Sequence, residues 1–202
     1  MSQNKKKEAM RQIRDEVWNL KNSPLYQERK NNNNYPVIGE GDHYARLFFV
    51  GEAPGRREAE SGRPFCGSAG KILDELLEMV NIERSGVYIT NVVKDRPPNN
   101  RDPYPEEIEL YAPFLDRQID IIRPLVIVTL GRFAMRYCLE RYGAELTVPT
   151  ISEAHGRSFA AQVSYGDIII FPLYHPAVAV YNRNQKQVLE DDMKRLVKEV
   201  DI

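Results

Sequence analysis

The sequence predicts an α/β fold, a three-layer α/β/α sandwich around a central four-stranded, mainly parallel sheet. Two observations lead to this prediction. Four short segments are apolar at consecutive positions, which is typical of strands buried on both faces, and segments with helical apolar spacing lie between them. Strands that alternate with helices along a chain form parallel βαβ units. We therefore expect helices on both faces of one sheet.

A helix is expected first, over about residues 5–20, because four apolar residues from Met10 to Leu20 recur at steps of three and four. The polar segment at about residues 31–36 has no apolar period and is expected to be a flexible loop. The expected strands are Leu47–Val50, Val87–Val92, Leu125–Thr129 and Ile168–Phe171. The other expected helices are Ala69–Val80, Pro105–Ile122, Arg132–Arg141 and Gln185–Val200.

Length and charge limit the possible classes of protein. A chain of 202 residues, 42% of them hydrophobic, buries one sizeable core, so we expect a single domain over residues 1–202. The net charge of -1 excludes a uniformly cationic nucleic-acid coat protein, and anion binding therefore requires a local patch. The basic residues Met1–Lys7 are not followed by an apolar run, and no run reaches membrane-spanning length. We expect a cytoplasmic protein with no membrane partner.

The cysteine count excludes several metal sites. Only Cys66 and Cys138 are present, which is too few for a four-cysteine zinc or iron–sulfur site. The same count disfavours a disulfide scaffold. No metal site is predicted.

Candidate binding residues follow the predicted strands, because ligands of such sheets bind beyond the carboxyl ends of the strands. The first strand leads into Gly51–Gly55, whose only acid is Glu52. The second ends at Asn91, whose amide either reads the edge of a pyrimidine or caps a turn. The fourth leads to His175, and Phe65 lies on a loop between glycines as a core residue or a ligand platform. No phosphate-binding loop is found.

Taken together and in order, these segments resemble the uracil-DNA glycosylase superfamily, and within it family 4, over roughly residues 23–196. The segments that carry the resemblance are Val50–Gly55, Gly62–Phe65 with Gly67 and Ala69–Gly70, Tyr88–Asn91, Arg96–Arg101, Leu130–Gly131 and Tyr174–Ala177. The resemblance implies a DNA repair glycosylase that hydrolyses the N-glycosidic bond of uracil in DNA. The products would be free uracil and an abasic site. We expect the reaction to require no metal or nucleotide cofactor.

The resemblance also implies residue roles. Glu52 would act on the catalytic water and His175 would stabilise negative charge at the uracil O2 atom, which makes these two the catalytic residues. The implied uracil-binding residues are Gly51, Glu52, Ala53, Phe65, Asn91 and His175. Asn100 would order the pocket, and the segment Ala177–Asn182 resembles a loop that probes the duplex. The expected DNA contacts are Arg63, Lys94, Arg96, Arg101 and Ala177.

One departure from family 4 is clear. Members of that family hold a 4Fe–4S cluster through four cysteines, and the corresponding positions here are Leu20, Ser23, Asp95 and Tyr111. We therefore predict that no iron–sulfur cluster is bound. Leu20 and Tyr111 are expected to replace it with apolar contacts, and Ser23 and Asp95 with polar ones.

Three functions remain open at this point. The first is uracil excision from single- and double-stranded DNA by a monomer. The second is excision of another deaminated base, such as hypoxanthine or xanthine. The third is a catalytically inactive DNA-binding or damage-sensing protein. The protonation state of Glu52 is also open, because burial would raise its pKa and remove the charge that activates water.

Overall fold

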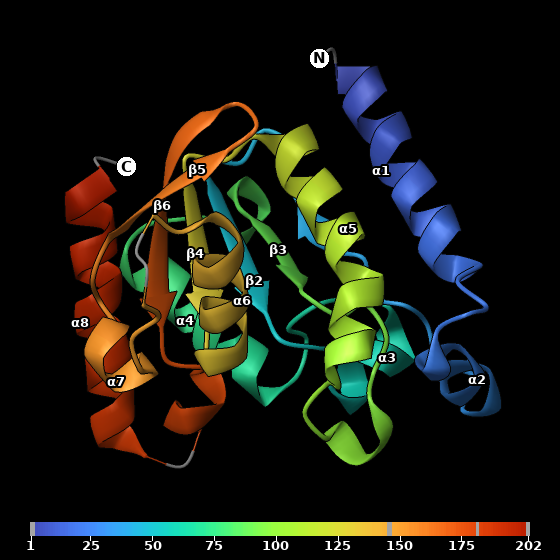
Figure 1. The fold of residues 1–202 in the computed structure, drawn as a ribbon. Coiled ribbons are helices and arrows are strands. Elements are labelled where there is room, and N and C mark those ends of the chain that lie inside the picture. Colours follow the sequence, from blue (N-terminus) through green and yellow to red (C-terminus); the bar gives the residue numbers. More distant parts are fainter. Residues whose placement is uncertain (1–2, 145–146, 181, 201–202) are drawn as a thin grey trace.

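The four predicted strands form the middle of one sheet in the computed structural model, which describes residues 3–144, 147–180 and 182–200 (Figure 1). The predicted domain limits, residues 1 and 202, fall outside this part of the chain. The strands are β2 (Leu47–Gly51), β3 (Tyr88–Asn91), β4 (Val126–Leu130) and β6 (Gly166–Leu173). They pair in parallel in the order β3-β2-β4-β6. Every residue of β2, β3 and β4 is buried, which explains their consecutive apolar positions.

The sheet has six strands, so the prediction of four is corrected by two edge strands. β1 (Glu40–Gly41) pairs antiparallel with β3, and β5 (Phe159–Val163) pairs antiparallel with β6. β1 has only two residues, and β5 alternates buried and exposed positions along its first four residues. Neither strand therefore shows the consecutive apolar run that marks a strand buried on both faces.

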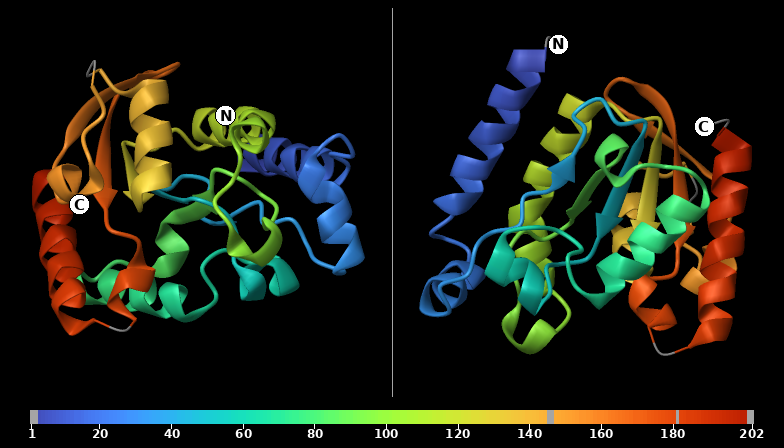
Figure 2. Two further views of the ribbon diagram at one scale, coloured as in Figure 1. Left: turned by 60° about the horizontal axis from the view of Figure 1, so that its bottom comes forward. Right: turned by 180° about the vertical axis from the view of Figure 1, so that it is seen from behind.

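Helices cover both faces of the sheet, as predicted (Figures 1 and 2). One face carries α4 (Ser68–Met79) and α8 (Arg183–Val200). The other carries α1 (Gln3–Trp18), α5 (Pro105–Ile122) and α6 (Arg132–Tyr142). Each layer closes its own apolar cluster against the sheet, with Leu76 and Met193 in one and Ile13 and Leu115 in the other. None of the helices in the described residues is long and apolar enough to cross a membrane.

Short elements fill the connections. They are α2 (Pro24–Asn31), α3 (Arg56–Ser61), α7 (Ile151–Ala154) and the 3-10 turns η1 (Arg84–Gly86), η2 (Pro98–Asn100) and η3 (Pro176–Ala179). The helix α2 was not predicted. Its start is nevertheless encoded, because the Ser23 hydroxyl accepts a hydrogen bond from the Leu25 backbone N–H and Pro24 occupies the first turn.

The segment after α2 has neither helix nor strand, and its backbone contacts both helix α3 and the loop that follows β3. The Tyr35 backbone N–H donates to the Ala59 carbonyl at 2.8 Å, and the Val37 N–H donates to the Lys94 carbonyl at 2.7 Å. This segment therefore connects α3 to the loop that follows β3.

The strand order places a crevice at one end of the sheet. From β2 the chain moves to β3 on one side, and it then crosses to β4 on the other side of β2. Such a reversal opens a crevice beyond the carboxyl ends of the strands, where α/β proteins bind ligands. The ends of β2, β3 and β6 meet there.

Candidate active site

A cavity of about 730 Å³ opens at the carboxyl ends of the parallel strands. It collects residues far apart in the sequence: Glu52 after β2, Phe65 before α4, Asn91 at the end of β3 and His175 after β6. Of the other predicted residues, the cavity is lined by Ala53, Asn100, Arg101 and Ala177. The residue Tyr181 of the predicted probing segment lies outside the described residues.

Gly51 lets two recognition groups approach each other. It pairs with Asn91 across β2 and β3. A Cβ atom on Gly51 would lie 2.3 Å from Asn91 Oδ1 and 2.8 Å from Phe65 Cζ, so a larger residue does not fit. Within the described part of the chain, no hydrogen-bond partner is found for the Asn91 amide group. A flat ring stacked on Phe65 would thus present its edge to a free amide.

The loop that carries Phe65 is held by a residue that sequence reasoning missed. Glu58 Oε1 accepts hydrogen bonds from the backbone N–H groups of Cys66 at 3.1 Å and Gly67 at 2.9 Å. Phe65 itself has φ of 46°, an uncommon backbone conformation for a bulky residue, and it is buried. No local pattern marks Glu58, because its partners lie eight and nine residues further along the chain.

His175 is oriented by the backbone. Its Nδ1 atom accepts a hydrogen bond from the Ala177 N–H at 3.2 Å, so the neutral ring carries its proton on Nε2. Burial lowers the pKa of His175 below its usual value, against a smaller opposing effect of the Glu58 charge. The ring lies 5.7 Å from the Phe65 ring, centroid to centroid. A neutral N–H donor is therefore placed beside the aromatic platform.

The environment of Glu52 disfavours the charge of its carboxylate. Burial, and then the nearby Asp102 carboxylate, raise the pKa of Glu52 to about 7, while Arg132 opposes them. Arg132 also pairs with Asp102 at 3.0 Å. A pKa near neutrality places Glu52 between its ionised and protonated forms at pH 7.

The predicted DNA-contact residues differ in whether they line the cavity: Arg101 and Ala177 do, and Arg63, Lys94 and Arg96 do not. Arg101 lines the cavity, where both of its terminal nitrogens bind the buried Glu107 carboxylate at 2.8 and 2.6 Å. Arg96 donates to Asn100 Oδ1 at 2.6 Å on the neighbouring turn. Arg63 is not among the cavity residues, and its guanidinium group binds Glu40 at 2.9 and 2.7 Å.

Lys94 requires a correction. It is fully buried, and its Nζ atom hydrogen-bonds to Thr90 Oγ1, the Asn91 carbonyl oxygen and Gln118 Oε1 at 2.8, 2.6 and 2.5 Å. Burial lowers the pKa of Lys94 well below its usual range. A phosphate cannot reach this group, so the predicted DNA contact is wrong. Lys94 instead fixes the end of β3, from which Asn91 projects.

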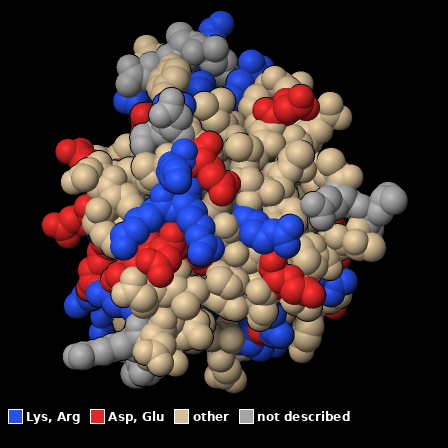
Figure 3. Space-filling model, turned by 90° about the vertical axis from the view of Figure 1, so that its left-hand side faces the viewer, with Lys and Arg blue, Asp and Glu red and all other residues tan. Residues whose placement is uncertain are grey.

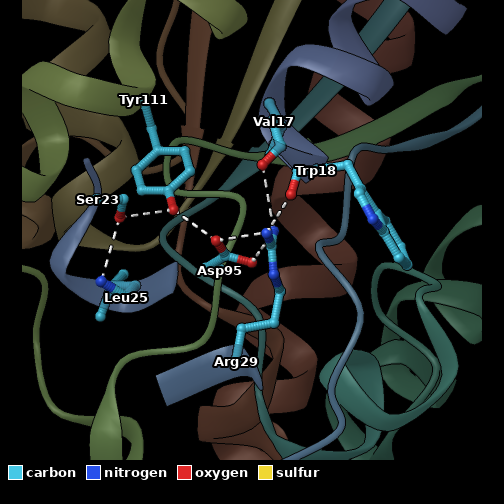
Figure 4. A network of polar contacts seen from close by, with 7 residues as sticks. All are labelled: Val17, Trp18, Ser23, Leu25, Arg29, Asp95 and Tyr111. Carbon is cyan, nitrogen blue, oxygen red and sulfur yellow. Dashed lines mark hydrogen bonds and ion pairs between the residues drawn. The ribbon is translucent and has the colours of Figure 1, made fainter. Parts of the chain in front are cut away.

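Three of the four positions that correspond to cluster cysteines, Ser23, Asp95 and Tyr111, lie in a buried polar network with Arg29 (Figure 4). The Tyr111 hydroxyl donates to Asp95 Oδ2 at 2.6 Å and lies 2.9 Å from the Ser23 hydroxyl. Arg29 Nη1 donates to both Asp95 oxygens at 3.1 Å. The Tyr111 contribution is therefore polar as well as apolar, which corrects the prediction, whereas Leu20 packs on the apolar core.

The chemistry of this network does not fit an iron–sulfur cluster. Such clusters are held by thiolates, and the four positions offer one hydroxyl, one phenol, one carboxylate and one alkyl chain. The phenol and the carboxylate already bind each other, and Arg29 neutralises the carboxylate. Among the described residues, no group of His, Cys, Asp and Glu is arranged to hold a metal ion.

The fold and the cavity together define an α/β protein with a cavity at the carboxyl ends of its parallel strands, lined by an aromatic ring, a side-chain amide, an imidazole and a carboxyl group. Comparison with known proteins is consistent with this class, since a profile of the Uracil DNA glycosylase superfamily matches residues 38–198. A Type-4 uracil-DNA glycosylase of Sulfurisphaera tokodaii is 46% identical over 190 residues, covering 94% of this chain and 84% of that protein. One of Thermotoga maritima is 40% identical over 189 residues, covering 92% of each. The chain belongs to the uracil-DNA glycosylase superfamily.

We expect Arg29→Met to lower the free energy of unfolding by about 3–5 kcal/mol, because it leaves the Asp95 charge buried without a partner. Arg136→Met, which removes an exposed pair with Glu140, should change it by less than about 1 kcal/mol. Adding Asp95→Asn to Arg29→Met should restore part of the loss. Urea denaturation measures all three, and equal effects of the two arginine substitutions would contradict this account.

Proposed function

We propose that this protein hydrolyses the N-glycosidic bond of uracil in DNA, releasing free uracil and leaving an abasic site. The observation that carries this proposal is the convergence of the Asn91 amide and the Phe65 ring over Gly51. Relatives named Type-4 uracil-DNA glycosylase support it. The substrate nucleotide would have to leave the base stack to enter the cavity.

Recognition of uracil follows from the groups in the cavity. The base stacks on Phe65, and its edge faces Asn91. The amide N–H₂ donates to the uracil O4 atom and the amide oxygen accepts from N3–H, a pair of bonds that cytosine cannot match because it has an amino group and an unprotonated N3. Gly51 keeps the space for this edge open. Glu58 does not contact the base in this proposal; it positions Phe65 by holding the loop that bears it.

Bond cleavage uses His175 and Glu52. As the bond between the sugar C1′ and uracil N1 breaks, its electron pair leaves with the base, and the His175 Nε2–H donates to the O2 atom that becomes negative. The ionised Glu52 favours the cationic sugar and orients a water molecule, whose oxygen bonds to C1′. The proton released by this water passes to Glu52 and finally to the departing uracil anion.

The remaining parts of the proposal concern partners and cofactors. Arg96, Arg101 and Ala177 contact DNA on either side of the uracil, and Asn100 orders the pocket from its turn. The protein acts as a monomer on single- and double-stranded DNA in the cytoplasm, and it needs no metal. It binds no iron–sulfur cluster, for which the donor set at Ser23, Asp95 and Tyr111 is unsuited.

The direct test is an oligonucleotide with one labelled uracil, incubated with protein prepared anaerobically and then treated with alkali. We expect strand scission at uracil, no stoichiometric iron and no cluster absorbance. Glu52→Ala, Asn91→Ala and His175→Ala should each lower the excision rate at least about 100-fold. Scission only with an inosine-containing strand would show that the substrate is another deaminated base. Binding without scission of either strand would show that the protein is a catalytically inactive homologue. Stoichiometric iron would refute the cluster-free proposal.

We expect Gly51→Ala to lower kcat/KM for uracil excision by about 100-fold or more, because its Cβ atom would displace the Asn91 amide and the Phe65 ring. Gly86→Ala is the matched control, since a Cβ atom there meets nothing within 4 Å. Thermal unfolding of both variants separates lost function from lost fold. A folded Gly51→Ala protein with wild-type kcat/KM would rule out this role of Gly51.

The pH dependence should report Glu52, which acts in its ionised form. We expect kcat/KM to rise with pH through a midpoint near 7, the pKa of Glu52. Asp102→Asn removes a like charge and frees Arg132, so the midpoint should move to lower pH. Asp191→Asn on α8 is the control and should leave the midpoint in place. A profile that is flat from pH 5.5 to 8 would contradict this role of Glu52.

A further inference from the structure

A second groove lies outside the proposed active site, between α1 and the segment that follows α2. We call it the α1 groove. It has a volume of about 540 Å³, and the residues that matter most along it are Lys7, Arg11, Arg14, Trp18, Tyr35 and Gly62. Seen from behind in Figure 2, α1, β1 and α3 lie on this side of the molecule.

The charge along the α1 groove has one sign. Lys7, Arg11 and Arg14 follow one another at helical spacing on α1, and none of the described residues that line the groove is acidic. Among the described residues, Arg14 pairs with its neighbour Asp15, and both side chains are more than half exposed. Exposed pairs of this kind contribute little, so the arginine remains available to an anion.

The opposite side of the molecule shows the contrast. There the surface over α8 carries basic and acidic groups side by side (Figure 3). Lys186 pairs with Glu75, and Lys194 with Asp191. Such a mixed surface is a solvated face, whereas three cations along a groove whose described lining residues include no acid create a local positive field.

Two aromatic rings stand exposed at one end of the α1 groove. Trp18 is 47% exposed and Tyr35 is 48% exposed, and their ring centroids are 6.0 Å apart. Both rings are anchored through their backbones. The Trp18 carbonyl accepts from buried Arg29 at 2.5 Å, and the Tyr35 N–H donates to the Ala59 carbonyl. The backbone contacts therefore hold the two residues side by side, and their exposed rings form an aromatic platform on which bases can stack.

The helix α3 joins this platform to the active-site cavity. Its first residues, Arg56 and Arg57, line the cavity, and Gly62, which follows its last residue, lines the α1 groove beside Tyr35. A helix of six residues is about 9 Å long, or roughly three nucleotides of stacked strand at 3.4 Å each. A strand that leaves the cavity along α3 thus reaches the platform within a few nucleotides.

We propose that the α1 groove binds single-stranded DNA that flanks the target nucleotide, with phosphates on Lys7, Arg11 and Arg14 and bases on Trp18 and Tyr35. This inference rests on the proposed function for the identity of the strand. Unpaired bases are required because paired bases do not expose their faces to a side chain. The groove accordingly favours uracil in single-stranded regions over uracil within a long duplex.

Trp18 is the only tryptophan of the chain, so its fluorescence reports on this site alone. We expect a 12-nucleotide single strand of thymidines to change the indole emission and a duplex of the same length to change it much less. Replacing Lys7, Arg11 and Arg14 by Gln should weaken single-strand binding at least about tenfold. It should also reduce the steepness of the plot of log binding constant against log salt concentration by about 2. Tyr35→Ala should weaken it by about fivefold or more.

The control neutralises Arg136, Lys194 and Lys198 to Gln, the same change of charge on exposed positions of α6 and α8. It should bind the strand as the wild type does. Excision from a trinucleotide with a central uracil should be unchanged in the α1-groove variant, whereas KM for a long single strand should rise. Equal binding by variant and control, or equal weakening for duplex, would overturn the proposal. If the wild type excised no uracil, the fluorescence titration would still test the α1 groove.

Discussion

The buried ion pair between Arg29 and Asp95 is the interaction on which the arrangement of the N-terminal half depends. The two side chains are 4% and 1% exposed, so neither charge has access to water. Taking two charges out of water costs several kcal/mol each, and this is offset only where further hydrogen bonds satisfy them. Arg29 meets that condition by donating also to the carbonyls of Val17 and Trp18, and Asp95 by accepting from Tyr111. One pair thus joins α1, α2, α5 and the loop after β3.

This pair also connects the two sites. Asp95 stands four residues after Asn91, and the buried Lys94 between them binds the Asn91 carbonyl at 2.6 Å. On the other side, Arg29 holds the end of α1 from which Trp18 projects. The Asn91 amide in the active-site cavity and the aromatic platform of the α1 groove are therefore both positioned by contacts close to the buried Arg29–Asp95 pair. Covalent ligation by a cluster would make the same connection through sulfur, which this chain lacks at all four positions.

What the sequence predicts depends on whether the signal is local. Consecutive apolar residues marked the four central strands, and the ends of those strands indicated Glu52, Asn91 and His175. The place of Phe65 in the site was implied by the family resemblance, because a phenylalanine between glycines is equally compatible with the core. Edge strand β5 escaped because its alternation over five residues is weak. Lys94 was misplaced because a lysine in a loop is normally solvated, and only the fold shows Thr90 and Gln118 around it. Glu58 was missed because its partners are backbone N–H groups, which no side-chain pattern announces.

The cavity sets two titratable groups against each other. Burial disfavours charge on both, so the same desolvation that keeps His175 neutral, as a donor to uracil must be, raises the pKa of Glu52 towards protonation. Deeper burial of the cavity would favour the neutral form of His175, but it would also favour the protonated form of Glu52, which cannot activate water. Arg132 acts against this limit because it favours the Glu52 charge, while Asp102, bound to Arg132, weakens that effect. Burial is thus the main cause of the raised Glu52 pKa, and the ion pair at the rim makes a smaller adjustment to it.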